Sequence, residues 1–259
     1  MIITLLTDFG TGDYYVAAMK GVILSRSPGT HLVDISHGIE PQVVLSGAYV
    51  LLGAYNWFPP GTIHVGVVDP GVGSSRRAII LRTQDYFFVG PDNGLFSLAV
   101  PNPVEAFEIR PSVYLPQKIS KTFHGRDIFA PVAAALSSGV NPAELGSPVR
   151  EVKELPALAE IAGKEIHSRI IHIDRFGNAV TGIRLDLLNS EILPGSFQLG
   201  VGDHRIQLQK RFYADPPIEA GRSFVIWGSL NFLEISITNG SAAKALGLFC
   251  GQEVTLSRP

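Results

Sequence analysis

Short apolar runs alternate with segments of helical character over the first 150 residues, and this alternation constrains the fold more than any other feature. Strand-like runs cover residues 2–6, 31–35 and 62–68, and helix-like segments cover 13–26 and 43–54 between them. The third run is nearly continuous in apolar residues, which is typical of a strand buried on both faces. Strands that alternate with helices predict a layered α/β structure with a mixed, largely parallel sheet.

Further elements complete this N-terminal region. Residues 77–81 and 86–89 are expected to form a strand pair, and residues 127–138 a helix. We therefore expect residues 1–150 to form a Rossmann-like α/β domain.

The pattern changes after residue 150. Residues 151–165 are charged, contain Pro156 and Gly163 and lack a period, so they are expected to form a linker. Beyond them, turns rich in Gly, Pro, Asn and Asp separate short strand-like runs. These runs are 167–173, 179–183, 197–201, 205–208, 223–227, 233–238 and 253–256. Their close spacing predicts a smaller C-terminal domain over 166–259, an antiparallel β-barrel or sandwich.

Composition excludes several classes of protein. The chain has 259 residues, 46% apolar and 17% charged, with a formal net charge of −2, so a clustered basic surface for nucleic acid is not expected. The single cysteine excludes an internal disulfide framework. The N-terminal run lacks the basic region of a signal peptide, and no segment approaches the roughly 20 apolar residues that span a bilayer. A cytoplasmic protein without a membrane partner is expected.

The first polar cluster follows the first strand, at residues 7–13 (Thr-Asp-Phe-Gly-Thr-Gly-Asp). Asp8 ends a buried strand, where an ionised group needs partners, and a pair of ligand hydroxyls would satisfy it. Asp13 is either a helix N-cap or a second binding carboxylate. The glycines complete no dinucleotide fingerprint and no phosphate-loop lysine follows, so phosphate binding is not expected.

The second cluster is the turn at residues 69–77. Asp69 stands at the end of an apolar strand, before a Pro-Gly-Val-Gly turn and the pair Arg76-Arg77. Open α/β sheets bind their ligands at such strand ends. A tight turn with a surface ion pair is the alternative interpretation.

The third cluster, residues 122–127, precedes the helix from residue 128. Asp127 is expected to cap that helix. His124, next to Phe123 and a glycine, is either structural or a crevice residue that Asp69 orients for proton transfer.

Two further clusters lie in the C-terminal region. In residues 174–178, Asp174 offers an acceptor for an ammonium group, Phe176 a stacking face and Asn178 an amide for a purine edge. A hairpin turn explains the same segment without a function. Residues 227–235 add a hydroxyl and aromatic rings.

These motifs, in this order, resemble the S-adenosyl-L-methionine (SAM) hydroxide adenosyltransferases, hydrolase relatives of the fluorinases and chlorinases. The resemblance covers essentially the whole chain. It rests on residues 7–13, 34–37 (Asp-Ile-Ser-His), 68–73 (Val-Asp-Pro-Gly-Val-Gly), 90–94 (Gly-Pro-Asp-Asn-Gly), 122–127 (Thr-Phe-His-Gly-Arg-Asp) and 174–178 (Asp-Arg-Phe-Gly-Asn).

The resemblance implies metal-independent hydrolysis of SAM to adenosine and L-methionine, with SAM as substrate and no cofactor. The matching hydrolytic residues are Asp69, Arg76 and His124. The halogenating relatives have tyrosines in place of Asp69 and His124 and a serine in place of Gly125, which favours water over halide.

The resemblance also implies the substrate contacts. Asp8 would hold the ribose hydroxyls, Asp174 and Ser229 the methionine end, and Asn178 with the backbone near Ile237 the adenine. Three further residues complete the expected set: Asp13, Phe123 and Phe176. Asn231, where the family commonly has glycine, and the pair Thr238-Asn239 depart from the pattern. A homotrimer is implied, with each site formed between the first domain of one subunit and the second domain of its neighbour.

In the expected mechanism, Asp69 and His124 bind one water and remove its proton as it attacks C5′. Arg76 is expected to pair with Asp69, because an unpaired guanidinium would repel the sulfonium by roughly 4 kcal/mol at 4 Å and an effective dielectric near 20. The alternatives are a halide-using adenosyl transferase, a metal-dependent hydrolase with ligands among Asp8, Asp13, Asp69 and His124, and a non-catalytic binding protein.

Overall fold

The computed structural model describes residues 1–100, 103, 105–188, 197–216 and 219–258. The chain divides into two compact units, Met1–Leu155 and Pro156–Pro259.

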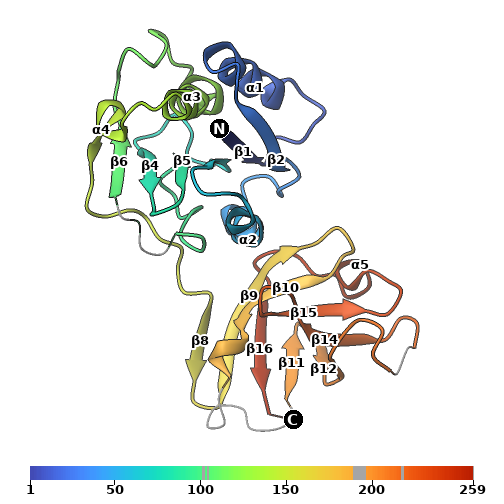
Figure 1. Cartoon of the computed structure of the whole chain (residues 1–259). Coiled ribbons are helices and arrows are strands. Elements are labelled where there is room, and N and C mark those ends of the chain that lie inside the picture. Colours follow the sequence, from blue (N-terminus) through green and yellow to red (C-terminus); the bar gives the residue numbers. More distant parts are fainter. Residues whose placement is uncertain (101–102, 104, 189–196, 217–218, 259) are drawn as a thin grey trace. The chain divides into compact units, whose positions relative to one another are not determined.

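Unit 1 is a mixed α/β structure built on a seven-stranded sheet with the order β2-β1-β3-β5-β4-β6-β7 (Figure 1). Strands β2, β1, β3, β5 and β6 point in one direction and β4 and β7 in the other, so most strands are parallel, as predicted. The strands are β1 (Ile2–Thr7), β2 (His31–Ser36), β3 (Ile63–Val67), β4 (Ala78–Arg82), β5 (Phe87–Pro91), β6 (Glu105–Ile109) and β7 (Gly146–Pro148).

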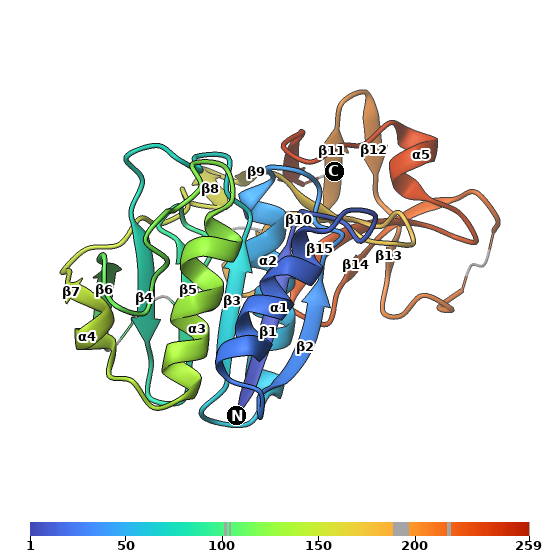
Figure 2. The same ribbon diagram turned by 90° about the horizontal axis from the view of Figure 1, so that it is seen from above.

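Helices cover both faces of this sheet. The helices are α1 (Tyr15–Arg26), α2 (Val44–Ala54), α3 (Ala130–Ser137) and the short α4 (Pro142–Leu145). Helices α1 and α3 lie side by side on one face (Figure 2), and α2 lies on the other. Alternation along β1 explains this arrangement, because Ile3 and Leu5 enter the core beneath α1 and α3, whereas Leu6 enters the core beneath α2.

Two helix starts differ from expectation. Helix α1 begins at Tyr15, and neither Asp13 nor any other side chain caps it. The helix expected from residue 127 begins earlier as a π-helical turn, η2 (Gly125–Phe129), which continues into α3. Asp127 therefore lies inside the helical segment, so its assignment as the N-cap is wrong.

Unit 2 is built on a nine-stranded, largely antiparallel sheet. Its order is β12-β11-β16-β9-β10-β15-β14-β13, with β8 paired to β9 beside this path, and β13 and β14 are parallel. The strands are β8 (Ala159–Ala162), β9 (Glu165–Ile173), β10 (Ala179–Arg184), β11 (Gln198–Val201), β12 (His204–Ile206), β13 (Gln209–Lys210), β14 (Ser223–Trp227), β15 (Phe232–Ile237) and β16 (Glu253–Ser257), with helix α5 (Ala242–Leu246). Closure into a barrel or sandwich stays a prediction.

The segment 151–165, expected to be a linker, contains β8 and the first residue of β9. Strand β8 is mostly exposed, so it lacks the apolar alternation that would have indicated a strand. In the described part of the chain, no helix has the length and apolar character needed to cross a bilayer.

Candidate active site

A cavity of about 370 Å³ opens in unit 1 where β1 and β3 end and η2 begins. Asp8, Asp69, Phe123 and His124 line it, together with Phe9, Tyr15, Pro41, Gln42, Val67, Pro70, Val72, Thr122 and Gly125. Three polar clusters far apart in the sequence therefore meet at one end of the sheet.

Asp69, Arg76 and His124 form one hydrogen-bonded cluster at this cavity. The Arg76 guanidinium pairs with both oxygens of Asp69, and its Nε lies 3.0 Å from each. Its Nη2 lies 2.9 Å from Nδ1 of His124. The predicted pairing of Arg76 with Asp69 is confirmed. The link from Asp69 to His124 runs through Arg76.

This contact fixes the tautomer of His124. A guanidinium can only donate, so Nδ1 must accept and the ring proton of the neutral imidazole lies on Nε2. Burial and the positive charge of Arg76 lower the pKa of His124, which favours the neutral ring. Against the expectation that His124 removes a proton from water, its Nε2 is a donor, and Asp69 is the acceptor of the pair.

Backbone geometry brings this cluster together. Gly73 has φ +79°, and any side chain there would collide with the carbonyl oxygen of Lys121, so the turn after β3 packs directly on the segment before His124. The neighbouring Arg77 points to Asp92 with an Nε–Oδ2 distance of 2.8 Å. The Phe129 ring lies 5.3 Å from the Arg76 guanidinium carbon, which fixes the arginine from below.

Hydrogen bonds and one close imidazole–carboxylate contact hold the cavity wall near Asp8. Asp8 Oδ2 accepts from the Gln42 N–H at 2.8 Å, and burial, with a smaller contribution from the negative charge of Asp69, raises the pKa of Asp8. Thr7 Oγ1 lies 2.8 Å from His37 Nδ1, whose Nε2 lies 3.1 Å from Asp34 Oδ1. The motif at 34–37 therefore supports the loop that carries Asp8.

The other predicted residues of unit 1 differ in position. Phe123 lines the cavity and packs edge-on against Tyr15 at 5.1 Å. Asp13 is exposed and is not among the lining residues. Asp127 accepts hydrogen bonds from the Ser120 N–H and from Arg126.

Unit 2 has its own cavity, of about 760 Å³, which Asp174, Phe176, Asn178 and Ile237 line. Tyr213, Ala214, Phe224, Thr238, Asn239 and Gly240 complete its wall. The structure thus gathers four of the five residues predicted in this region.

Asp174 and Asn178 orient one another. Asp174 Oδ1 accepts from the backbone N–H groups of Phe176 and Asn178 at 2.9 and 2.8 Å, and Oδ2 accepts from Asn178 Nδ2 at 2.8 Å. The Asn178 amide therefore keeps its oxygen as a free acceptor, which suits the exocyclic amine of a purine. Phe176 is 78% exposed, so its ring is available for stacking.

Ser229, the fifth predicted residue, is exposed in the turn between β14 and β15 and does not line the cavity. Asn231, in the same turn, has φ +60°. Asn239, which follows β15, has φ +55°. Asparagine tolerates this left-handed conformation better than most residues, so Asn231, at the position where the family pattern has glycine, keeps a glycine-like backbone.

Sequence reasoning missed two residues, Tyr213 in the wall of this cavity and Glu234 behind it. Tyr213 Oη donates to Glu234 Oε2 at 2.8 Å. A signal was present for Glu234, because it is the one charged residue of the buried strand β15, Phe-Leu-Glu-Ile-Ser-Ile.

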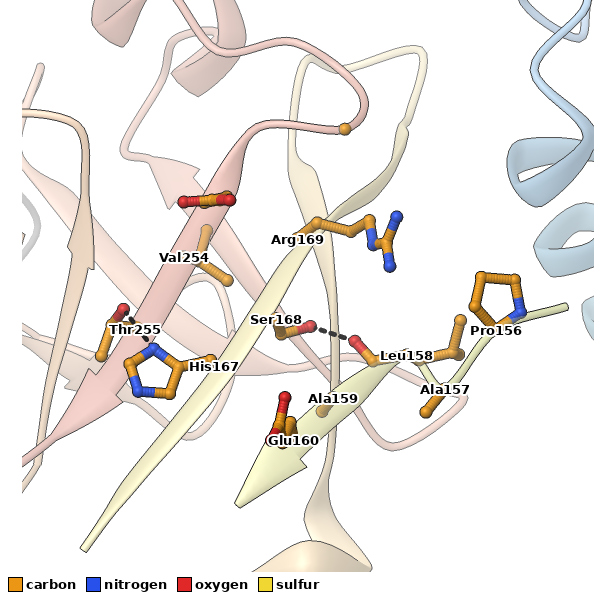
Figure 3. A pocket seen from close by; sticks show the side chains of 12 residues that line it. Pro156, Ala157, Leu158, Ala159, Glu160, His167, Ser168, Arg169, Val254 and Thr255 are labelled. Atoms are coloured by element: carbon orange, nitrogen blue, oxygen red, sulfur yellow. Dashed lines mark hydrogen bonds between the residues drawn. The ribbon is translucent and has the colours of Figure 1, made fainter. Parts of the chain in front are cut away.

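A third cavity, of about 580 Å³, lies along β8, β9 and β16 (Figure 3). Arg169, His167 and Glu160 are among its lining residues, and the Ser168 hydroxyl donates to the Leu158 carbonyl at 2.6 Å. None of the predicted site residues lines it. Within the described ranges, no group of three or more His, Cys, Asp or Glu side chains is arranged to hold a metal ion.

Comparisons with known proteins bear on both units. The sequence model of the SAM hydroxide adenosyltransferase N-terminal domain matches residues 3–146, and that of the C-terminal domain matches residues 168–255. The (R)-S-adenosyl-L-methionine hydrolase of Thermus thermophilus is 40% identical over 262 residues, 97% of each chain. A fluorinase of Actinoplanes sp. is 28% identical over 217 residues, 72% of this chain and 73% of the fluorinase. The crystal structure of an uncharacterized conserved protein from Thermotoga maritima is 32% identical and covers 100% of both chains with a TM-score of 0.87.

Proposed function

This chain belongs to the SAM hydroxide adenosyltransferase family, and we propose that it hydrolyses S-adenosyl-L-methionine to adenosine and L-methionine. The observation that carries the proposal is the cluster of Asp69, Arg76 and His124 at the unit 1 cavity. The hydrolase of Thermus thermophilus, at 40% identity, supports water as the nucleophile over halide, since the fluorinase is 28% identical.

In the proposed step, the oxygen of one water forms a bond to C5′ of the ribose while the C5′–S bond breaks. The electron pair of that bond leaves with sulfur, so methionine departs as a neutral thioether and no acid is needed. Holding water and substrate in line supplies roughly 7–11 kcal/mol of the barrier reduction. Direct displacement inverts the configuration at C5′.

The cluster divides two roles between its acceptor and its donor. Nε2–H of His124 donates to the water oxygen and orients it, and the Asp69 carboxylate accepts the proton that the water loses as it attacks. Arg76 holds both side chains and is neutralised by Asp69, which limits its repulsion of the sulfonium. Proton acceptance of this kind is worth on the order of 10²–10⁴-fold in rate.

The substrate contacts are assigned as follows. Asp8 holds the ribose hydroxyls with its oxygen that is not bound to Gln42. Asn178 and the backbone near Ile237 read the adenine, and Phe176 walls the pocket. Asp174 binds the methionine ammonium with remaining lone pairs of its carboxylate, and Ser229 binds the methionine carboxylate. Phe123 packs beside the ribose, and Asp13 adds a further contact once substrate is bound.

We also propose a homotrimer in which unit 1 of one subunit and unit 2 of its neighbour share each substrate molecule. Its support is that most of the residues assigned to one substrate divide between two cavities: Asp8 and Phe123 line that of unit 1, and Asp174, Phe176, Asn178 and Ile237 line that of unit 2. Light scattering of the purified protein would report a mass three times that of the 27.9 kDa chain. A monomer that retains full activity would contradict this assembly.

The reaction is proposed to need no metal, because the positively charged Arg76 guanidinium contacts both Asp69 and His124 and would repel a cation bound there. The name of the Thermus thermophilus relative further suggests the R configuration at the sulfonium sulfur as the preferred substrate epimer.

One experiment tests the function. The protein is incubated with each SAM epimer in ¹⁸O-labelled water, with and without a chelator. The products are separated by chromatography, and their masses are measured by mass spectrometry. Adenosine that carries one ¹⁸O, formed equally with chelator, is the expected result. Intact SAM would indicate a binding protein, loss of activity with chelator a metal enzyme, and a halogenated nucleoside in the presence of halide a transferase.

A further inference from the structure

Glu234 is a buried carboxylate behind the unit 2 cavity to which the proposed reaction gives no role. It is 7% exposed and comes from the centre of β15, where all six residues are buried. A carboxylate in such a place is costly unless hydrogen bonds satisfy it. The hydroxyl of Tyr213 donates to Glu234 Oε2 at 2.8 Å.

The bond to Glu234 anchors the hydroxyl end of the Tyr213 side chain. Tyr213 lies in a turn in which the Asp215 N–H donates to the Phe212 carbonyl at 2.9 Å, and the residue is 52% exposed. The ring meets Phe224 edge-on with centroids 6.3 Å apart. Both rings line the cavity, so the bond to Glu234 sets the position of one cavity wall.

Glu234 also contacts the turn after β14. A side chain at Gly228 would collide with its Oε1, so this carboxylate oxygen packs directly on the glycine that precedes Ser229. Burial, with a smaller contribution from the negative charge of Asp174, raises the pKa of Glu234. One buried side chain therefore touches both the aromatic wall and the turn assigned to the methionine end.

We infer that Glu234 is a positioning residue that fixes Tyr213 in the wall of the substrate cavity through the hydroxyl-to-carboxylate hydrogen bond. This inference rests on the proposed function, because it assigns the cavity to the adenosine and methionine parts of SAM. Glu234 acts through Tyr213 and does not take part in the chemical step. Its loss should therefore weaken binding and leave turnover largely intact.

Three single variants and one double variant test the inference: E234A, E234Q, Y213F and E234A/Y213F. The readouts are KM and kcat for SAM and the Kd of adenosine by calorimetry, with thermal melting to check folding. E234A should raise KM and Kd about tenfold and change kcat by less than about threefold. In E234Q the amide oxygen still accepts from Tyr213, so both constants should stay within about threefold of wild type.

Y213F removes only a hydroxyl from a half-exposed ring, so it should fold and should raise KM at least about threefold. The double variant should bind no more weakly than E234A, because both changes break the same bond. Unchanged KM and Kd in E234A overturn the inference. Additive effects of the two changes on KM and Kd in the double variant also overturn it. So does an E234Q that binds SAM and adenosine as weakly as E234A, because that result would assign the effect to the negative charge and not to the hydrogen bond.

The adenosine measurement separates this inference from the proposed function. A wild-type protein that hydrolyses SAM, with E234A equal to it, overturns the positioning role alone. A wild-type protein that binds adenosine but leaves SAM intact, with E234A weakened, overturns hydrolysis alone. A wild-type protein that binds neither ligand overturns both.

Discussion

The two cavities differ in whether their carboxylates are paired with a positive charge. In unit 1 the guanidinium of Arg76 neutralises Asp69 and faces His124, so the cluster is internally compensated. In unit 2 Asp174 accepts from amides and Glu234 from a tyrosine hydroxyl, and among the described residues no positively charged side chain forms an ion pair with either carboxylate.

The contrast suggests different roles for the two cavities, the chemical step in unit 1 and substrate binding in unit 2. A compensated cluster holds its geometry before the substrate arrives, which suits the orientation of water. Uncompensated carboxylates gain most when a cation enters, and the proposed substrate carries both a sulfonium and an ammonium group. The unit 1 cavity should therefore control turnover, and the unit 2 cavity should control affinity.

The largest expected effect comes from Asp69→Ala, which removes the proton acceptor and leaves Arg76 unpaired. Turnover should fall by about 10³-fold. The Kd of adenosine, measured by calorimetry, should change little, because its assigned base contacts lie in unit 2. Normal turnover in this variant would remove Asp69 from the mechanism and break the division between the two cavities.

A second prediction concerns the stability of unit 1. His64 is fully buried among aromatic rings, with Nδ1 2.8 Å from Thr4 Oγ1, and burial lowers its pKa to about 4. Because the pKa is lowered on folding from 6.5, the contribution of neutral His64 is complete above pH 6.5 and is lost as pH falls toward 4. The loss is on the order of 3 kcal/mol.

Denaturant unfolding at pH 7 and pH 4.5 measures this effect, with His64→Phe as the comparison. The wild-type free energy of unfolding should fall more steeply with acid than that of the variant, since Phe does not titrate. Equal slopes for the two proteins would contradict it.

Asp174→Asn should raise KM about tenfold and leave kcat nearly unchanged, because one charged hydrogen bond to the ammonium is lost. Steady-state kinetics gives both constants. A fall in kcat with KM unchanged would place Asp174 in the chemical step and would erase the contrast with Asp69.

The smallest effect concerns pH. Since burial and Arg76 lower the pKa of His124, kcat/KM should stay constant down to pH 6.5 and fall only below it, where protonated Nδ1 would face the guanidinium. A profile of kcat/KM measured from pH 5 to 8 tests this. In His124→Gln the activity should be low, and the fall of kcat/KM below pH 6.5 should disappear. A limb above pH 6.5 would contradict the assigned tautomer.

The sequence allowed much of unit 1 to be predicted, because its central strands are continuous apolar runs and its site residues follow strand ends. The strands that were not predicted have a weaker signal: β6 carries two charged residues in five, β7 has only three residues, and β8 is mostly exposed. The π-helical start at Gly125 was missed because no residue pattern distinguishes it from an α-helix.

Local reasoning also failed where partners come from distant segments. Arg76 lies between Asp69 and His124 because two loops pack against each other, although Arg76 and His124 are 48 residues apart in the sequence. Tyr213, in the turn after β13, and Glu234, in β15, meet although they are 21 residues apart in the sequence, and Tyr213 belongs to none of the predicted clusters. The type of each side chain was readable, whereas its hydrogen-bond partner was a property of the folded sheet.

The π-helical turn at Gly125–Phe129 makes the active cluster unusually sensitive to chain length. A π-helical turn contains an additional residue relative to an ordinary helix, and each residue of an α-helix turns the chain by about 100°. Deleting one residue there would restore a regular helix and rotate His124 relative to Phe129, so its ring would leave Arg76 although every functional side chain is still present. A homologue shortened at this point should be folded and inactive.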